Sequence, residues 1–141
     1  MHTNPSDDEL RTILVETKTI AMLGASNNAE RASHGIMKML LDAGYRVIPV
    51  NPKETEILGQ KAYASLADIP EKVEIVDVFR KSEDTPGIAD EAIAAGAKVL
   101  WLQLGVSNED AAAKAKAAGL TVVMDKCIGA THRLLHIAKK S

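Results

Sequence analysis

The stretch that decides the fold runs from residue 19 to residue 33 and reads TIAMLGASNNAERAS. Its apolar first part ends at Leu23, Gly24 and small polar residues follow, and a helix-like segment opens near Ser33. A strand, a tight turn of small residues and a helix start, in this order, expose backbone N–H groups beside the positive end of a helix dipole. The stretch therefore predicts an anion pocket of the kind that holds a nucleotide phosphate.

The rest of the chain continues this alternation of strands and helices. Short apolar runs predict strands at residues 19–23, 46–50, 74–78, 98–102 and 121–124. Amphipathic or alanine-rich segments predict helices at residues 7–16, 33–43, 85–95, 108–118 and 130–139, with one helical turn at 65–68. Apolar strands that alternate with helices favour a parallel sheet covered on both faces.

We therefore expect an α/β fold: a Rossmann-like three-layer domain with a five-stranded parallel sheet in the order 3-2-1-4-5. Residues 1–141 are expected to form one domain, in which residues 1–17 contribute an N-terminal capping helix. Ser6 and Glu9 have the spacing of a capping box at the start of that helix.

The composition of the chain indicates which class of ligand it binds and in which cellular compartment it is found. The formal net charge of −2 argues against a general nucleic-acid binder, and the apolar runs are too short to span a membrane. The N-terminus is polar and acidic, unlike a secretory signal, and the single cysteine, Cys127, cannot form an internal disulfide. We expect a cytoplasmic protein with a small-molecule ligand. A protein partner or a homo-oligomer is left open.

Ligands of such sheets bind outside the carboxyl ends of the strands, at the point where the strand order reverses. The order 3-2-1-4-5 places that point between the first and fourth strands. The candidate residues therefore follow the five strands: 24–26 (Gly-Ala-Ser), 51–53 (Asn-Pro-Lys), 79–81 (Phe-Arg-Lys), 103–105 (Gln-Leu-Gly) and 125–127 (Asp-Lys-Cys).

The residues after the second strand discriminate between nucleotides. A dinucleotide fingerprint G-x-G-x-x-G/A is matched only in part, by Gly24, Ser26 and Ala29. An NAD site needs an acid after the second strand for the ribose 2′-hydroxyl, whereas Lys53 suits an additional ribose phosphate. Arg80 and Lys81, after the third strand, add further cations. These residues leave NADP, with its 2′-phosphate, and coenzyme A, with its 3′-phosphate, as alternatives.

Five segments together resemble a known family in order and spacing. They are residues 24–26 (GAS), 44–52 (GYRVIPVNP), 76–80 (VDVFR), 101–106 (WLQLGV) and 124–127 (MDKC). The chain resembles the small stand-alone CoA-binding-domain family, whose members look like the N-terminal nucleotide domain of the succinyl-CoA synthetase α subunit. The resemblance implies a Rossmann-like CoA-binding domain with coenzyme A as its ligand.

The resemblance also implies which residues contact the ligand. Phosphate contacts are implied for Gly24, Ala25, Ser26, Asn27 and Arg31. Contacts on the adenosine side are implied for Asn51, Pro52, Lys53, Phe79 and Arg80. A place near the pantetheine arm is implied for Gln103 and Cys127.

We expect binding of coenzyme A or an acyl-CoA through a Rossmann-like phosphate loop, without catalysis by this chain alone and without a metal site. One alternative is an NADP-dependent reductase or NADP-sensing module. Another is an interaction protein that kept the fold and lost the ligand.

Some individual residues have two interpretations. Phe79 either caps the core or stacks on adenine, and Trp101 belongs to the core. Cys127 is either a small buried apolar residue or a thiol close enough to the pantetheine end to form a mixed disulfide. His132 and His136 have the i, i+4 spacing of a zinc helix, but Arg133 replaces the glutamate that such a helix needs, so we expect a solvated helix end.

Overall fold

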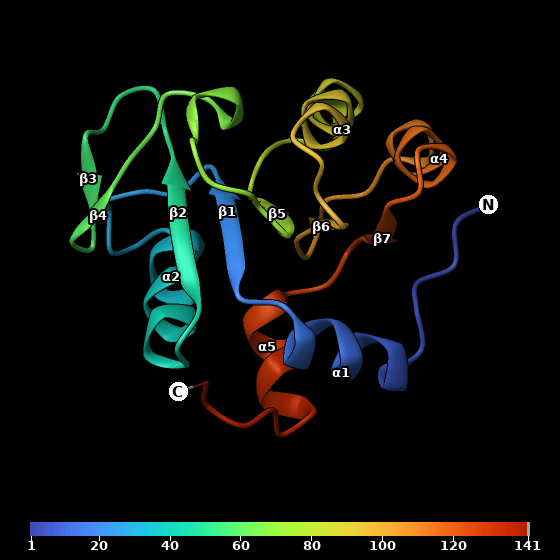
Figure 1. Ribbon diagram of the computed structural model, residues 1–141, viewed down its shortest axis with the longest axis horizontal. Helices are drawn as coiled ribbons and strands as arrows, with labels where there is room; N and C mark the ends of the chain where they lie inside the picture. Colours follow the sequence, from blue (N-terminus) through green and yellow to red (C-terminus); the bar gives the residue numbers. More distant parts are fainter. Residues whose placement is uncertain (141) are drawn as a thin grey trace.

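The computed structural model describes residues 1–140 and is built around a five-stranded parallel sheet (Figure 1). The strands are β1 (Thr19–Leu23), β2 (Arg46–Val50), β5 (Ile75–Val78), β6 (Val99–Leu102) and β7 (Thr121–Val123). They are short and almost wholly buried, as strands covered on both faces must be. The predicted fold class, an α/β Rossmann-like domain with a five-stranded parallel sheet, is confirmed.

The strand order differs from the expectation at one strand. The order is β2-β1-β5-β6-β7, so the third main strand, β5, lies beside β1 instead of outside β2. The outer edge of β2 is occupied by Tyr63, which donates its N–H to the carbonyl of Pro49 (3.0 Å) and accepts from Asn51 N–H (2.9 Å). All four β5 residues are buried, which suits a central strand. The order therefore reverses between β1 and β5, not between the first and fourth main strands.

Helices cover both faces of the sheet and form the outer two of three layers. In Figure 1, α3 (Thr85–Ala94) and α4 (Glu109–Ala117) lie on one side. The other side carries α1 (Asp7–Glu16), α2 (Ala32–Asp42) and α5 (Ile128–Leu134). Because successive side chains of a strand point to opposite faces of the sheet, the strands contribute residues to two separate apolar cores, one on each face. Among residues 1–140, no helix has both the length and the apolar character that crossing a membrane requires.

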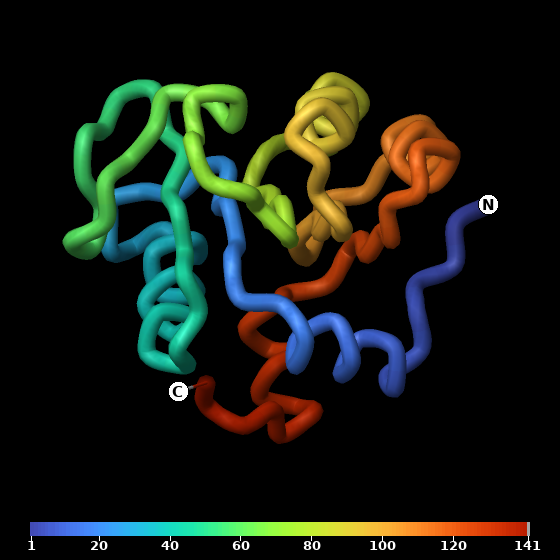
Figure 2. Tube along the Cα trace, viewed as in Figure 1, coloured from blue at the N-terminus to red at the C-terminus, as the bar shows by residue number. Residues whose placement is uncertain are grey.

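The two ends of the chain are tied to different parts of the domain (Figure 2). The N-terminal segment runs past α4 and β7, where His2 N–H donates to Glu109 (2.7 Å) and Asn4 bonds the backbone of Met124. The Ser6–Glu9 capping box is present at the start of α1, as predicted. The last helix is shorter than predicted and ends at Leu134, because His136 adopts a left-handed conformation (φ 53°) that turns the chain.

A small hairpin between β2 and β5 was not predicted. It pairs β3 (Glu56–Ile57) with β4 (Gln60–Lys61) and is followed by a 3₁₀ turn, η1 (Leu66–Asp68). The two turn residues, Leu58 and Gly59, both have positive φ. Leucine rarely adopts this conformation, so the sequence lacks the Asn-Gly or Asp-Gly signal that identifies such turns.

Gly24, directly after β1, generates a prediction. Its φ is +87°, and a Cβ there would overlap the carbonyl oxygen of Phe79. Gly96 has a similar φ (+73°) but open space around the position of a Cβ. Gly96→Ala should therefore cost about 1 kcal/mol of unfolding free energy from backbone strain alone. Gly24→Ala should cost clearly more, as measured by urea denaturation. Equal losses would contradict the close approach of Gly24 to Phe79.

Candidate functional site

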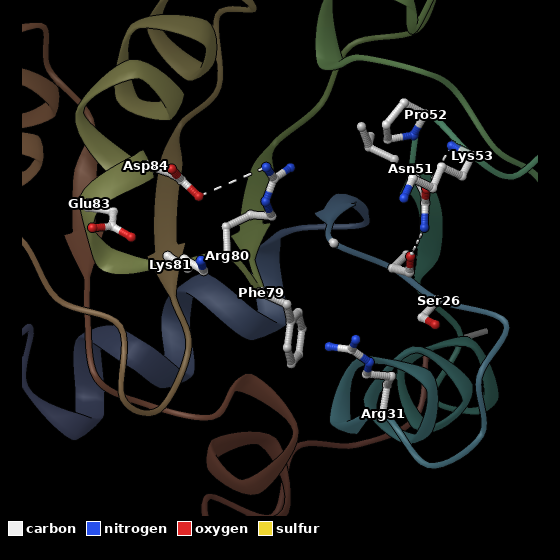
Figure 3. Close-up of a pocket in the computed structure, with 13 residues that line it drawn as sticks. Ser26, Arg31, Asn51, Pro52, Lys53, Phe79, Arg80, Lys81, Glu83 and Asp84 are labelled. Carbon is white, nitrogen blue, oxygen red and sulfur yellow. Dashed lines mark hydrogen bonds and ion pairs between the residues drawn. The ribbon is translucent and has the colours of Figure 1, made fainter.

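A cleft with a volume of about 640 Å³ lies at the carboxyl ends of β1, β2 and β5 (Figure 3). Nine of the twelve residues predicted for the site line it: Gly24, Ala25, Ser26, Arg31, Asn51, Pro52, Lys53, Phe79 and Arg80. The remaining lining residues are Val50, Lys81, Glu83 and Asp84. The cleft occupies the reversal point of the strand order, where ligands of open α/β sheets bind.

The first loop of the cleft is suited to an anion. Gly24 N–H continues the sheet by donating to the carbonyl of Val50 (3.2 Å), and the chain then loops to the start of α2. Arg31 occupies the N-cap position of α2, and its side chain makes no capping hydrogen bond. His34 N–H donates to the carbonyl of Arg31 (3.1 Å), so the two preceding N–H groups of the uncapped helix start are the ones left for an external acceptor.

Two asparagines hold the loops of the cleft in place. Asn51 donates from Nδ2 to the carbonyl of Ala25 (2.8 Å) and accepts from Lys53 N–H through Oδ1 (2.8 Å), which joins the loop after β1 to the loop after β2. Asn27 does not line the cleft. Its Nδ2 donates to a carboxylate oxygen of Glu54 (2.6 Å) and to the carbonyl of Glu56 (2.9 Å). Both asparagines thus fix loop geometry.

Cations predominate in the cleft. Arg31, Lys53, Arg80 and Lys81 line it together with two acids, Glu83 and Asp84. Arg80 lies 3.9 Å from Asp84 in a partly exposed ion pair. Within residues 1–140 the side chains of Arg31 and Lys53 form no hydrogen bond or ion pair. In Figure 3 the guanidinium of Arg31 points across the cleft towards Phe79.

Gln103 and Cys127 do not reach this cleft. They line a second hollow of about 530 Å³ between α2, the end of β6 and α5. Cys127 is half-buried at the N-cap of α5, and its Sγ accepts from Ala130 N–H (3.4 Å). The cleft and the second hollow both border the start of α2, where Arg31 lines the cleft and Ala32 lines the hollow.

A buried acid behind Gln103 was missed by the sequence analysis. Asp77, in the middle of β5, is wholly buried and accepts a hydrogen bond from Gln103 Nε2, while its Oδ2 has no partner among the described residues. Burial raises the pKa of Asp77 to about 8, and the bond from Gln103 opposes that rise. The usable signal was a lone acid in an otherwise apolar strand. Gln103 also accepts from Ile128 N–H (3.3 Å), so it links β5, β6 and α5.

The expectation of a solvated helix end at His132 is wrong. His132 is buried and packs edge-on against the ring of Tyr45, with 5.7 Å between the ring centroids. Burial, and then the nearby charge of Lys140, lower the pKa of His132. Trp101 is fully buried, as expected, and donates from Nε1 to the carbonyl of Lys126 (2.9 Å). No group of three or more His, Cys, Asp or Glu side chains within residues 1–140 could hold a metal ion.

Glu83 and Asp84 line the cleft but were not among the predicted candidates, whereas Lys81 was a candidate because it follows the third main strand. Glu83 and Asp84 belong to η2 (Ser82–Asp84), a 3₁₀ turn that precedes α3. Their polar character gave no indication that they face the cleft, because the turn that directs them inwards has no strong sequence signature.

The raised pKa of Asp77 predicts a specific pH dependence. The folded protein holds a proton on Asp77 between about pH 4 and pH 8, where the unfolded chain does not. The contribution of Asp77 to stability must therefore fall as the pH rises through that window. Asp77→Asn removes the titration, so the variant should gain stability relative to the wild type as the pH rises from 4 to 8. Urea denaturation at several pH values measures this difference, and a constant difference would contradict a neutral Asp77.

Known proteins are similar to this chain in sequence, and a solved structure is similar to it in fold. The protein of Bacillus subtilis named "Uncharacterized protein YneT" is 46% identical over 129 residues, covering 92% of this chain and 96% of that protein. A solved structure described as a hypothetical protein from Pyrococcus horikoshii OT3 superposes with a TM-score of 0.91 and 44% identity, covering 96% of this chain and 99% of that one.

A larger enzyme also contains a related segment. The ADP-forming acetate–CoA ligase of Methanocaldococcus jannaschii is 31% identical over 81 residues, which are 57% of this chain and only 12% of the ligase. The family model described as "CoA binding domain" matches residues 18–133, from the start of the sheet to the last helix. The chain therefore belongs to the CoA-binding domain family.

Proposed function

We propose that this protein binds coenzyme A or an acyl-CoA in the cleft at the carboxyl ends of β1, β2 and β5. The observation that carries the proposal is the convergence of an uncapped helix start with Arg31, Lys53 and Arg80 on one cleft. Membership of the CoA-binding domain family gives independent support. We further propose that the chain binds this ligand without catalysing a reaction alone.

The diphosphate is assigned to the loop after β1. The backbone N–H groups of Ala25 and Ser26 and those at the start of α2 are the donors. Arg31 supplies a guanidinium that can hold phosphate oxygens in a bidentate manner. In this arrangement Asn51 holds the loop through Ala25, so its role is positioning rather than direct binding.

The adenosine end is assigned to the side of the cleft formed by Pro52, Lys53 and Arg80. The side-chain ammonium of Lys53 has no acceptor within residues 1–140, which suits a 3′-phosphate on the ribose. An adjoining hollow of about 370 Å³ extends past Pro52 to Leu66 and Ile88 and offers apolar walls to a flat base. The loop after β2 offers the cleft no acid of the kind that an NAD site uses, since the first acid of that loop, Glu54, accepts a hydrogen bond from Asn27 and does not line the cleft.

Thermal unfolding with each nucleotide in turn tests the proposal. A ligand at about 100 times its Kd adds roughly 2.7 kcal/mol to the stability of the folded state. For a domain of this size we expect coenzyme A to raise Tm by about 10 °C. NADP, NAD and ATP should each raise it far less. A shift with NADP alone would favour a nucleotide-dependent reductase or sensor, and no shift with any of them would favour an interaction protein.

A lysine substitution tests the orientation of the ligand. Lys53→Ala should weaken the binding of coenzyme A about tenfold, because a charge-assisted phosphate contact is lost. Isothermal titration measures this change in Kd. The substitution should leave the binding of dephospho-CoA, which lacks the 3′-phosphate, nearly unchanged. Lys72→Ala is the matched control, because Lys72 is equally exposed and lies outside the cleft. An equal loss of affinity for coenzyme A and for dephospho-CoA would show that Lys53 does not contact the 3′-phosphate.

A further inference from the structure

The hollow between α2 and α5 differs from the cleft in chemistry. Four of its lining residues are Ala32, Gly35, Ile36 and Met39, which recur at the i, i+3, i+4, i+7 spacing of one helix face. Only one lining residue, Arg133, carries a charge, whereas six of those in the cleft do. A phosphate has little to bind here, while an apolar group finds a complementary surface.

The far end of this helix face is closed by close packing. α5 lies against α2 at Gly129, where a Cβ would come within 2.7 Å of Ile36 Cδ1 and 3.0 Å of Met39 Sδ. This contact holds Ile36 and Met39 in place. Towards the start of α2 the face is open, because a Cβ at Gly35 would meet nothing within 4 Å. The hollow therefore has an apolar end that is packed against α5 and an open end towards the start of α2.

The amide of Gln103, at the end of β6, is already engaged within the protein. Gln103 donates to Asp77 and accepts from Ile128 N–H, so its amide is held by the protein itself. Leu104, at the same rim, is 73% exposed and is one of the few large apolar side chains in the described chain that lie open to solvent. An apolar ligand in the hollow would cover part of this side chain.

We infer that this hollow is an acyl subsite: it holds a neutral aliphatic acyl chain of several carbons whose CoA portion occupies the cleft. The inference rests on the proposed function, because the nucleotide must lie in the cleft for its thioester end to cross the start of α2. Arg31 lines the cleft and Ala32, the next residue, lines the hollow, so the start of α2 borders both spaces. A volume of about 530 Å³ lies within the range of small-molecule sites.

Chain-length dependence tests the inference on the full protein. Isothermal titration should give Kd values that fall from coenzyme A to butyryl-CoA to hexanoyl-CoA, by up to about fourfold for each buried methylene. Mass spectrometry after the titration checks that the thioester is intact. Succinyl-CoA should bind more weakly than butyryl-CoA, since its terminal carboxylate would have to enter an apolar space.

A substitution that fills the hollow tests whether the acyl chain binds there. Gly35→Leu projects a side chain into the open part of the hollow and replaces glycine by a better helix former, so the variant should fold. It should abolish the gain in affinity with acyl chain length and change the Kd of free coenzyme A less than twofold. Lys38→Leu adds the same side chain at an exposed position of α2 that does not line the hollow, and it should retain the gain.

The outcomes separate the two proposals. If free coenzyme A does not bind, the proposed function fails and this inference fails with it. If coenzyme A and hexanoyl-CoA bind equally, or if Gly35→Leu keeps the chain-length gain, only the acyl subsite is overturned. Tighter binding of succinyl-CoA than of butyryl-CoA would also overturn it, because Arg133 would then be selecting a carboxylate.

Discussion

The close approach of β1 and β5 at their carboxyl ends is the constraint on which the candidate site depends. Phe79 N–H donates to the carbonyl of Leu23 (2.8 Å), and Gly24 lies against the carbonyl of Phe79 without room for a side chain. Gly24 also bonds to Val50. These contacts bring the ends of three neighbouring strands to one level, and the loops that leave them diverge around a cleft. A bulkier residue at this junction would separate the loops that carry the cations.

The start of α2 divides the site into two environments. On one side lie the cationic cleft and the loop after β1, and on the other lies an apolar hollow closed by α5. A ligand with a phosphorylated head and an apolar tail matches this division, and one without either part would leave a region of the site uncovered. Beneath the hollow, Asp77 and Gln103 form a buried polar pair that connects two strands to α5. A neutral carboxyl group can remain there because burial disfavours its charged form.

Local signals in the sequence were reliable for the five main strands and for most helix ends. Apolar runs identify β1 and β5 because covered parallel strands need apolar residues on both faces. Glycines after the helices identify their ends, since a left-handed residue there completes the last turn. The same local patterns could not identify the hairpin at Leu58 and Gly59, because leucine stands where such turns usually have Asn or Asp before the glycine. They also missed the early end of α5, because no glycine or proline follows this helix.

The sequence by itself determined the alternation of strands and helices, the small-residue turn after β1, and nine residues that the cleft brings together. Only the tertiary structure decided that β5 pairs with β1, because strand order depends on which sheet edge the segment around Tyr63 occupies, and that choice is made over long range. Tertiary structure also assigned Gln103 and Cys127 to a separate hollow and turned Asn27 towards Glu54. The direction of a loop side chain depends on partners distant in the chain, which no local pattern encodes.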